Sequence, residues 1–327
     1  MSMQIPVISV ASLLDGSDPQ SVADAIGAAC RDNGFFYVID HGVPLELQDR
    51  LEALSAEFFA LDHDTKMAIA MPLGGVAWRG FFPVGDELTS GRPDVKEGIY
   101  FGTQLTRDHP RVQAGTPLHG PNLMPAHPAA LGPTVLEYMA AVTDLAHDLM
   151  RAVGLSLGLD EGWFHDHLTA DPTVLFRIFN YPPAPAVEGE QWGVGEHTDY
   201  GLLTILKQDH HGGLQVRSPQ GWIEAPPVEN AFVCNIGDML DRLTGGQYRS
   251  TPHRVRASPG YHRMSWPLFF DPAWDADVRP VGAAALADDR DTRWDNASVH
   301  EFSGTYGQYL LGKVGKVFPA LAASLDR

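Results

Sequence analysis

The chain of 327 residues is poor in cysteine and in positive charge, and it has no long apolar run. Cys30 and Cys234 are its only cysteines, which is too few for a disulfide framework. We therefore expect two packed, reduced thiols and a cytoplasmic location. No stretch of about 18 apolar residues is present, so no helix is expected to span a bilayer. The first residues lack the basic and apolar regions of a secretory signal.

Acidic side chains clearly outnumber basic ones. The sequence has 41 Asp and Glu against 23 Lys and Arg, a formal net charge of −18. A surface this negative repels phosphate backbones and anionic lipid headgroups, so we expect no nucleic-acid or membrane partner. Hydrophobic residues make up 44% of the chain, which is enough for a substantial globular core. The expected partner is a small molecule, and the composition says nothing about oligomeric state.

The first half of the chain reads as a mixture of helices and strands. The apolar patterns predict strands over residues 5–10 and 35–39, and helices over about 20–32, from Pro44 onward, and from a capping box of Thr134 and Glu137. The Gly- and Pro-rich stretch over residues 72–103 is expected to be irregular.

The second half follows a different pattern, in which short β-rich runs alternate with Gly and Pro turns. Such regular spacing predicts an antiparallel sandwich or barrel, with helix returning over residues 299–314. The expected strands are Leu175–Tyr181, His197–Lys207, Gly213–Val216, Trp222–Glu224, Ala231–Ile236, Arg249–Arg256 and Tyr261–Phe270.

Three residues in this β-rich half form a candidate metal site. His197 and Asp199 are two positions apart, so on a strand they face the same way. His253 follows on a later predicted strand, with 53 residues between it and Asp199. Two imidazoles and one carboxylate are the facial triad of non-haem Fe(II) oxygenases. Zinc accepts the same ligands, so these residues alone leave the metal open.

A candidate carboxylate site follows the triad. Arg263 comes ten residues after His253, and the strand period puts Ser265 on the same face. A guanidinium and a hydroxyl together bind a carboxylate through charge-assisted hydrogen bonds. Fe²⁺ with one Asp ligand keeps one positive charge and Arg263 adds another. A dicarboxylate such as 2-oxoglutarate would neutralise both.

These motifs resemble the isopenicillin-N-synthase-like family of 2-oxoglutarate/Fe(II)-dependent dioxygenases. The resemblance extends over about residues 5–312 and implies a mainly β fold, with a double-stranded β-helix (jelly-roll) core packed by N-terminal and C-terminal helices. The motifs that carry it are His197-Thr-Asp199-Tyr-Gly, Gly212-Gly-Leu-Gln-Val, Asn235-Ile-Gly-Asp238, Thr251-Pro-His253-Arg-Val and Arg263-Met-Ser265, with Ile5-Pro-Val-Ile, residues 34–44 and Lys96-Glu-Gly-Ile-Tyr-Phe101 in the front half.

The resemblance also assigns roles to residues. It implies that His197, Asp199 and His253 are the catalytic iron ligands, and that Arg263, Ser265 and Tyr181 hold the distal carboxylate of 2-oxoglutarate. The chain departs from many plant members at Phe179, where they carry Asn. One integrated domain is expected, with an N-terminal α/β region over 1–125, a connecting helix over 126–170, the β core over 171–275 and a helical cover over 276–327.

The implied activity is that of a non-haem iron oxidoreductase. It would oxidise a small organic molecule by hydroxylation, or by desaturation or cyclisation, while 2-oxoglutarate and O₂ yield succinate and CO₂. Ascorbate is a candidate reductant. Phe269 lies six residues beyond Arg263 and therefore faces inward, so it is a candidate substrate contact. Phe101 and Tyr306 are weaker candidates, and core packing is the competing explanation for all three.

Three other functions remain open at this point. The same fold serves Fe(II) oxidases that use no 2-oxoglutarate, as isopenicillin N synthase and aminocyclopropane-carboxylate oxidase do. An ethylene-forming enzyme that cleaves 2-oxoglutarate is a variant of the main interpretation. A non-catalytic small-molecule receptor belongs to a different class, and the intact metal ligands argue against it.

Overall fold

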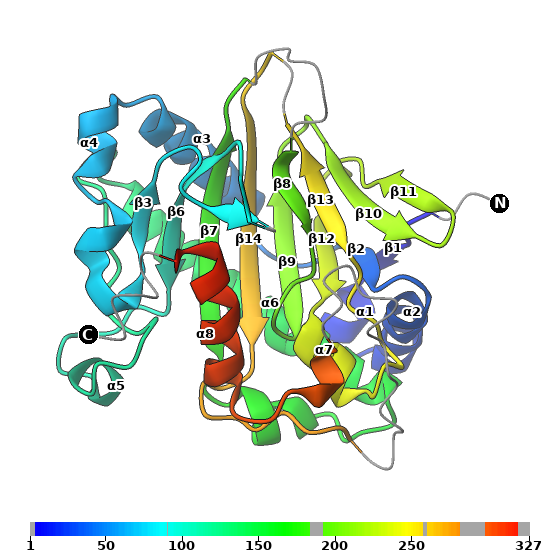
Figure 1. The fold of residues 1–327 in the computed structure, drawn as a ribbon. Coiled ribbons are helices and arrows are strands. Elements are labelled where there is room, and N and C mark those ends of the chain that lie inside the picture. Colours follow the sequence, from blue (N-terminus) through cyan, green and yellow to red (C-terminus); the bar gives the residue numbers. More distant parts are fainter. Residues whose placement is uncertain (1–3, 90, 184–191, 258–259, 282–297, 320–327) are drawn as a thin grey trace.

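The computed structural model describes residues 4–89, 91–183, 192–257, 260–281 and 298–319. Within these residues the core consists of one large and one small antiparallel-rich sheet (Figure 1). The large sheet has the strand order β1 (Val7–Ser9), β2 (Phe35–Ile39), β12 (Phe232–Ile236), β9 (Leu203–Gln208), β14 (Arg263–Asp271), β7 (Thr173–Tyr181), β6 (Glu97–Gly102), β3 (Gly80–Phe82). The small sheet has the order β11 (Gly221–Glu224), β10 (Leu214–Ser218), β13 (His253–Arg256), β8 (Trp192–His197). This is the jelly-roll core that the sequence predicts.

Strands from the front half of the chain extend both edges of the large sheet. β2 pairs antiparallel with β12 at one side, and β6 pairs antiparallel with β7 at the other. A hairpin of β4 (Leu88–Thr89) and β5 (Arg92–Pro93) lies against the small sheet near β8. The N-terminal residues therefore share the hydrophobic core of the barrel.

Helices cover the large sheet from two sides (Figure 1). The long helix α6 lies behind the sheet and packs against β9 and β14, while α8 lies in front of the lower part of β7 in this view. None of the described helices is long and apolar enough to cross a membrane. The α-helices are α1 (Ala11–Leu14), α2 (Pro19–Asp32), α3 (Leu45–Phe59), α4 (His63–Met67), α5 (Pro110–Gln113), α6 (Leu131–Ser156), α7 (Asp238–Leu243) and α8 (Tyr306–Val317). Residues Met71–Ala77 and Val299–Glu301 form 3-10 helices, and His165–Thr169 form a π-helix.

Local sequence signals explain where several helices begin. The carboxylate of Asp18 accepts a hydrogen bond from the Ser21 backbone N–H, and Pro19 takes the first helical position of α2. Thr305 and Gln308 form a reciprocal capping box at the start of α8. The capping box predicted at Thr134 was wrong. Helix α6 already begins at Leu131, so the Thr134 backbone bonds to Ala130 inside the helix.

Two expectations about strands were also wrong. Residues 197–207 form two strands rather than one, because the backbone between them bonds to residues 237–239 instead of a sheet neighbour. Asp199 therefore lies in the turn after β8. The segment over 72–103 is not irregular, since it contains β3 and β6. Its glycines permit close packing, as a Cβ at Gly98 would lie 2.7 Å from Cε1 of Phe82.

The turn that carries Asp199 leaves no room for a side chain at Gly201. A Cβ there would lie 1.4 Å from Oδ1 of Asp271. We predict that Gly201→Ala lowers the free energy of unfolding by about 1–3 kcal/mol, because overpacked cores must shift to relieve the clash.

Gly312 provides the matched control, since nothing lies within 4 Å of a Cβ built at this position in α8. Gly312→Ala is expected to stabilise the protein by about 0.5–1 kcal/mol, because alanine suits a helix better than glycine. Thermal unfolding of both variants tests this expectation. A similar change in Tm for the two substitutions would contradict it.

Candidate metal centre

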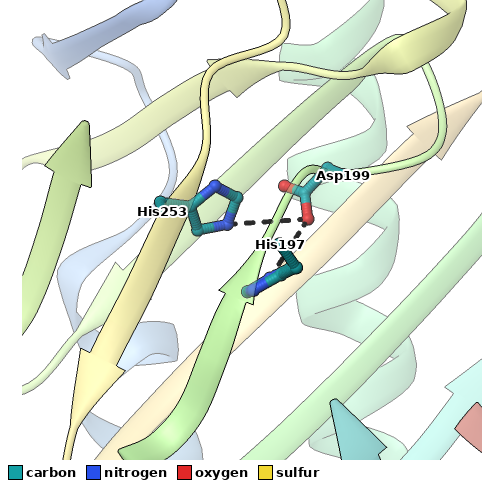
Figure 2. Close-up of side chains that lie close together, drawn as sticks. All are labelled: His197, Asp199 and His253. Atoms are coloured by element: carbon teal, nitrogen blue, oxygen red, sulfur yellow. Dashed lines mark ion pairs between the residues drawn. The ribbon is translucent and has the colours of Figure 1, made fainter. Parts of the chain in front are cut away.

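Three side chains meet inside the jelly roll with their ligand atoms within 4.8 Å of one another (Figure 2). Nε2 of His197 lies 3.8 Å from Oδ1 of Asp199, and Nε2 of His253 lies 3.7 Å from the same oxygen. His197 ends β8, Asp199 follows in the turn, and His253 begins β13 directly opposite His197. Two neighbouring strands of the small sheet and the turn between the sheets thus supply the three predicted ligands.

Both imidazoles are held in the orientation that a metal ligand needs. Nδ1 of His197 lies 2.8 Å from the Gly195 carbonyl, and Nδ1 of His253 lies 3.2 Å from the Thr251 carbonyl. A carbonyl accepts a hydrogen bond, so the proton sits on Nδ1 and the lone pair of Nε2 points to the centre. Burial, followed by the neighbouring His253, lowers the pKa of His197 to about 4, so its ring is neutral at neutral pH.

The two oxygens of the Asp199 carboxylate have different surroundings. Oδ2 accepts hydrogen bonds from Oγ1 of Thr204 at 2.5 Å and from Nδ2 of Asn235 at 2.7 Å. Oδ1 faces the two imidazoles. Burial favours the neutral acid, but the two histidines and these hydrogen bonds outweigh it and lower the pKa of Asp199. The donor set is therefore two imidazoles and one carboxylate, which fits Fe(II).

The predicted carboxylate site lies in the same cavity. Arg263 on β14 is directly opposite Tyr181 on β7, and its guanidinium lies over that ring at 4.7 Å. Nε of Arg263 donates to the Gly212 carbonyl. Nη1 and Nη2 are buried, and no described residue accepts a hydrogen bond from them. Ser265 adds a hydroxyl 3.4 Å from the Tyr181 hydroxyl. Unused buried donors on a guanidinium are what a bound carboxylate would satisfy.

A cavity of about 320 Å³ connects the two sites. Of the three predicted substrate residues, only Phe269 lies on its wall. Phe101 is buried against Phe176 in the core. Tyr306 is fully buried behind the wall, where its hydroxyl donates to Asp271. Phe179 does line the cavity beside the Arg263 site.

Sequence reasoning missed a group of charged residues on the same wall. Arg177 on β7, Lys96 just before β6 and Glu87 just before β4 all line the cavity. The strand period contained the signal for Arg177, which precedes Tyr181 by four residues and so shares its face. Glu87 carried no such signal, because it lies in a segment predicted to be irregular.

Fold and site together define a jelly-roll oxygenase with a non-haem iron centre that uses 2-oxoglutarate. Residues 5–127 match the family model of the non-haem dioxygenase in morphine synthesis N-terminal region, and residues 172–272 match the 2OG-Fe(II) oxygenase superfamily. The chain belongs to the 2OG-Fe(II) oxygenase superfamily. Its cofactors are Fe(II) and 2-oxoglutarate, and it is a dioxygenase that acts on a small molecule.

Similar proteins cover nearly the full length. A probable iron/ascorbate oxidoreductase of Dictyostelium discoideum is 48% identical over 97% of this chain and 96% of its own. A 1-aminocyclopropane-1-carboxylate oxidase of the same organism is 36% identical over 97% of this chain and 95% of its own. The crystal structure of a full-length Neurospora crassa protein in complex with alpha-KG (2-oxoglutarate) and thymine matches with a TM-score of 0.77 and 27% identity, over 98% of this chain and 97% of that one.

The hydrogen bonds to Asp199 generate a prediction about metal affinity. Thr204→Val keeps the shape of the side chain but removes the hydroxyl that orients the carboxylate. Loss of such an orienting partner commonly costs about 10–100-fold in metal affinity. A titration with Co²⁺, a redox-stable substitute for Fe(II), measures the change.

Thr169→Val is the control. Thr169 is fully buried, and its hydroxyl has no hydrogen-bond partner among the described residues. This variant should bind Co²⁺ as the parent does. Equal affinity for all three proteins would show that Thr204 does not orient the ligand.

Proposed function

We propose that His197, Asp199 and His253 hold Fe(II), and that Arg263, Ser265 and Tyr181 hold 2-oxoglutarate for the hydroxylation of a small organic molecule. One observation carries the assignment of residues. The two unpartnered nitrogens of Arg263 are buried in the same cavity as the triad, and no described residue accepts their hydrogen bonds. The reaction balances as 2-oxoglutarate, O₂ and R–H giving succinate, CO₂ and R–OH.

The chain's own residues bind, orient and exclude water. When bound, Fe(II) supplies the activation of O₂ that couples decarboxylation of the keto acid to oxidation of the substrate. Arg263 and Tyr181 fix the distal carboxylate, and Ser265 adds a hydroxyl beside it. Asp199 and the two imidazoles leave one side of the centre open to the cavity. The apolar part of the wall, which includes Phe269 and Leu206, keeps the reaction away from bulk water.

Several finer features belong to the same proposal. Ascorbate as reductant is supported by the relative named an iron/ascorbate oxidoreductase. A reducing, cytoplasmic location is supported by Cys30 and Cys234, which are both free and buried. The acidic net charge of −18 supports a small-molecule partner rather than nucleic acid.

Succinate release tests the proposed function. The purified protein with Fe(II), ascorbate and 2-oxoglutarate should form succinate slowly under air, and faster when a substrate from a metabolite mixture is added. His253→Ala should abolish succinate formation and leave the protein folded, because an open triad serves catalysis rather than stability. Succinate formation by His253→Ala at the parent's rate would refute the metal assignment.

Arg263→Lys tests the assignment of the 2-oxoglutarate site. Lysine keeps the charge but loses the planar fork, so the KM for 2-oxoglutarate should rise. A charge-assisted contact of about 1.5–3 kcal/mol corresponds to about 10–150-fold. Arg217→Lys is the control, because Arg217 is an exposed arginine on β10 outside the cavity. An unchanged KM in Arg263→Lys would show that the cosubstrate binds elsewhere.

A further inference from the structure

A second arginine on the cavity wall has no hydrogen-bond partner in the part of the chain that the structure describes. Among these residues, none accepts a hydrogen bond from the Arg177 guanidinium, and its buried Nε is unpaired. The closest carboxylate oxygen, Oε1 of Glu87, lies 3.8 Å from Nη1 of Arg177, beyond hydrogen-bond distance. The guanidinium thus presents unused donors to the cavity.

Aromatic rings hold this guanidinium in place. It lies 4.0 Å from the centroid of Tyr100 and 4.8 Å from that of Phe269. A cation between aromatic faces is stabilised without using its N–H donors. Phe269 therefore supports Arg177, whether or not it also touches the substrate. An arginine that is fixed in this way is pre-organised for a planar anion.

The neighbouring carboxylate has other partners. Oε1 of Glu87 accepts a hydrogen bond from the Tyr100 hydroxyl at 2.5 Å. Oε2 of Glu87 lies 2.9 Å from Nζ of Lys96, which also pairs with Asp94 at 2.5 Å. Glu87 forms an ion pair with Arg177 at 3.8 Å but accepts no hydrogen bond from it. The donors of Arg177 therefore remain available for a ligand.

Arg177 and Arg263 lie at different places along the cavity wall. Tyr181, opposite Arg263, and Arg177 are four residues apart on β7. At a strand rise of about 3.4 Å per residue, the two arginine positions are separated by about 14 Å. A five-carbon diacid whose two carboxylates are held at Arg263 and at the metal has no carboxylate left for Arg177. The second arginine thus serves a second molecule, the substrate.

Charges and apolar groups around Arg177 define that molecule further. Helix α8 adds Lys313 and Lys316 to the same wall. Lys313 is paired with Asp238 at 3.4 Å, whereas Lys316 is exposed at the cavity. The remaining wall is largely apolar and includes Leu175, Leu310 and Val317. This end of the cavity favours a negative group attached to an apolar body.

We propose that Arg177 binds a carboxylate of the substrate that the enzyme oxidises. The enzyme would then act on small carboxylic acids with an apolar body. The inference rests on the proposed function, because it assumes that Arg263 is occupied by 2-oxoglutarate. Arg177 is here a substrate-binding residue that selects the substrate class. It holds one end of the molecule while the other end extends toward the triad.

The test measures binding without turnover. The protein is saturated with Co²⁺ and 2-oxoglutarate, so that Arg263 is occupied, and dissociation constants are measured by ligand-observed NMR. The probes are acids with their primary amides: phenylacetate with phenylacetamide, and hexanoate with hexanamide. The parent should bind at least one acid about tenfold or more tightly than its amide, as expected for a charge-assisted contact. In Arg177→Gln the dissociation constants of the acid and of its amide should become similar.

Two further variants keep the test decisive. Arg217→Gln removes an exposed arginine outside the cavity and should keep the parent's acid preference. Arg177→Lys keeps the charge and loses the fork, so its preference should lie between those of the parent and Arg177→Gln. It carries the test if Arg177→Gln does not fold.

Several results would overturn the inference. These are an equal affinity of the parent for acids and amides, no binding of any acid at millimolar concentration, tighter binding of thymine than of any acid, or an unchanged acid preference in Arg177→Gln. Succinate release by the parent is measured separately and reports on the proposed function alone. If the parent prefers acids but releases no succinate, the proposed function is refuted and the binding site at Arg177 stands. If it releases succinate but shows no acid preference, only the proposal about Arg177 is refuted.

Discussion

The arrangement of the site depends on the Asp199 carboxylate, whose two oxygens have different partners. Asp199 gives Oδ2 to hydrogen bonds from β9 and β12, through Thr204 and Asn235, and turns Oδ1 toward two imidazoles on β8 and β13. Strands from both sheets thus converge on a single buried group. The hydrogen bonds keep the carboxylate charged and oriented, and they leave its other oxygen available to a metal. The small residue Gly201 lets the turn that carries Asp199 approach Asp271 closely.

The alternation of side chains along β14 and β7 determines which residues face the cavity beside this centre. Inward positions on β14 run from Arg263 through Ser265 to Phe269, and those on β7 run from Tyr181 to Arg177. One end of the cavity therefore has the chemistry of the cosubstrate. The other end has a second guanidinium and an apolar wall. The order of residues along β14 and β7 therefore determines where the cosubstrate and the substrate would bind along the cavity, which also contains the triad.

Much of this could be predicted from the sequence, although not always for the right reason. Period-two spacing predicted that His197 and Asp199 share a face and that Arg263 and Ser265 share a face. The structure brings these four residues and His253 to one cavity, but Asp199 is in a turn rather than on a strand. The strands β3 and β6 were hidden because Gly98 and Gly102 look like turn residues, whereas they are packed closely against Phe82 and Arg79. The grouping of Glu87, Lys96 and Arg177 on the cavity wall depends on contacts between distant segments, and local patterns carry no information about such contacts. Phe101 could not be told from a cavity residue by its type alone.

An anaerobic titration tests the central claim most directly. Fe(II) and then 2-oxoglutarate are added to the purified protein without O₂, and the visible absorption is recorded. The account predicts one Fe(II) and one 2-oxoglutarate bound per chain, with a charge-transfer band that requires both and is absent from Asp199→Ala. Binding of 2-oxoglutarate with the same affinity in the absence of metal, and without this band, would contradict the claim that the triad and Arg263 form one site.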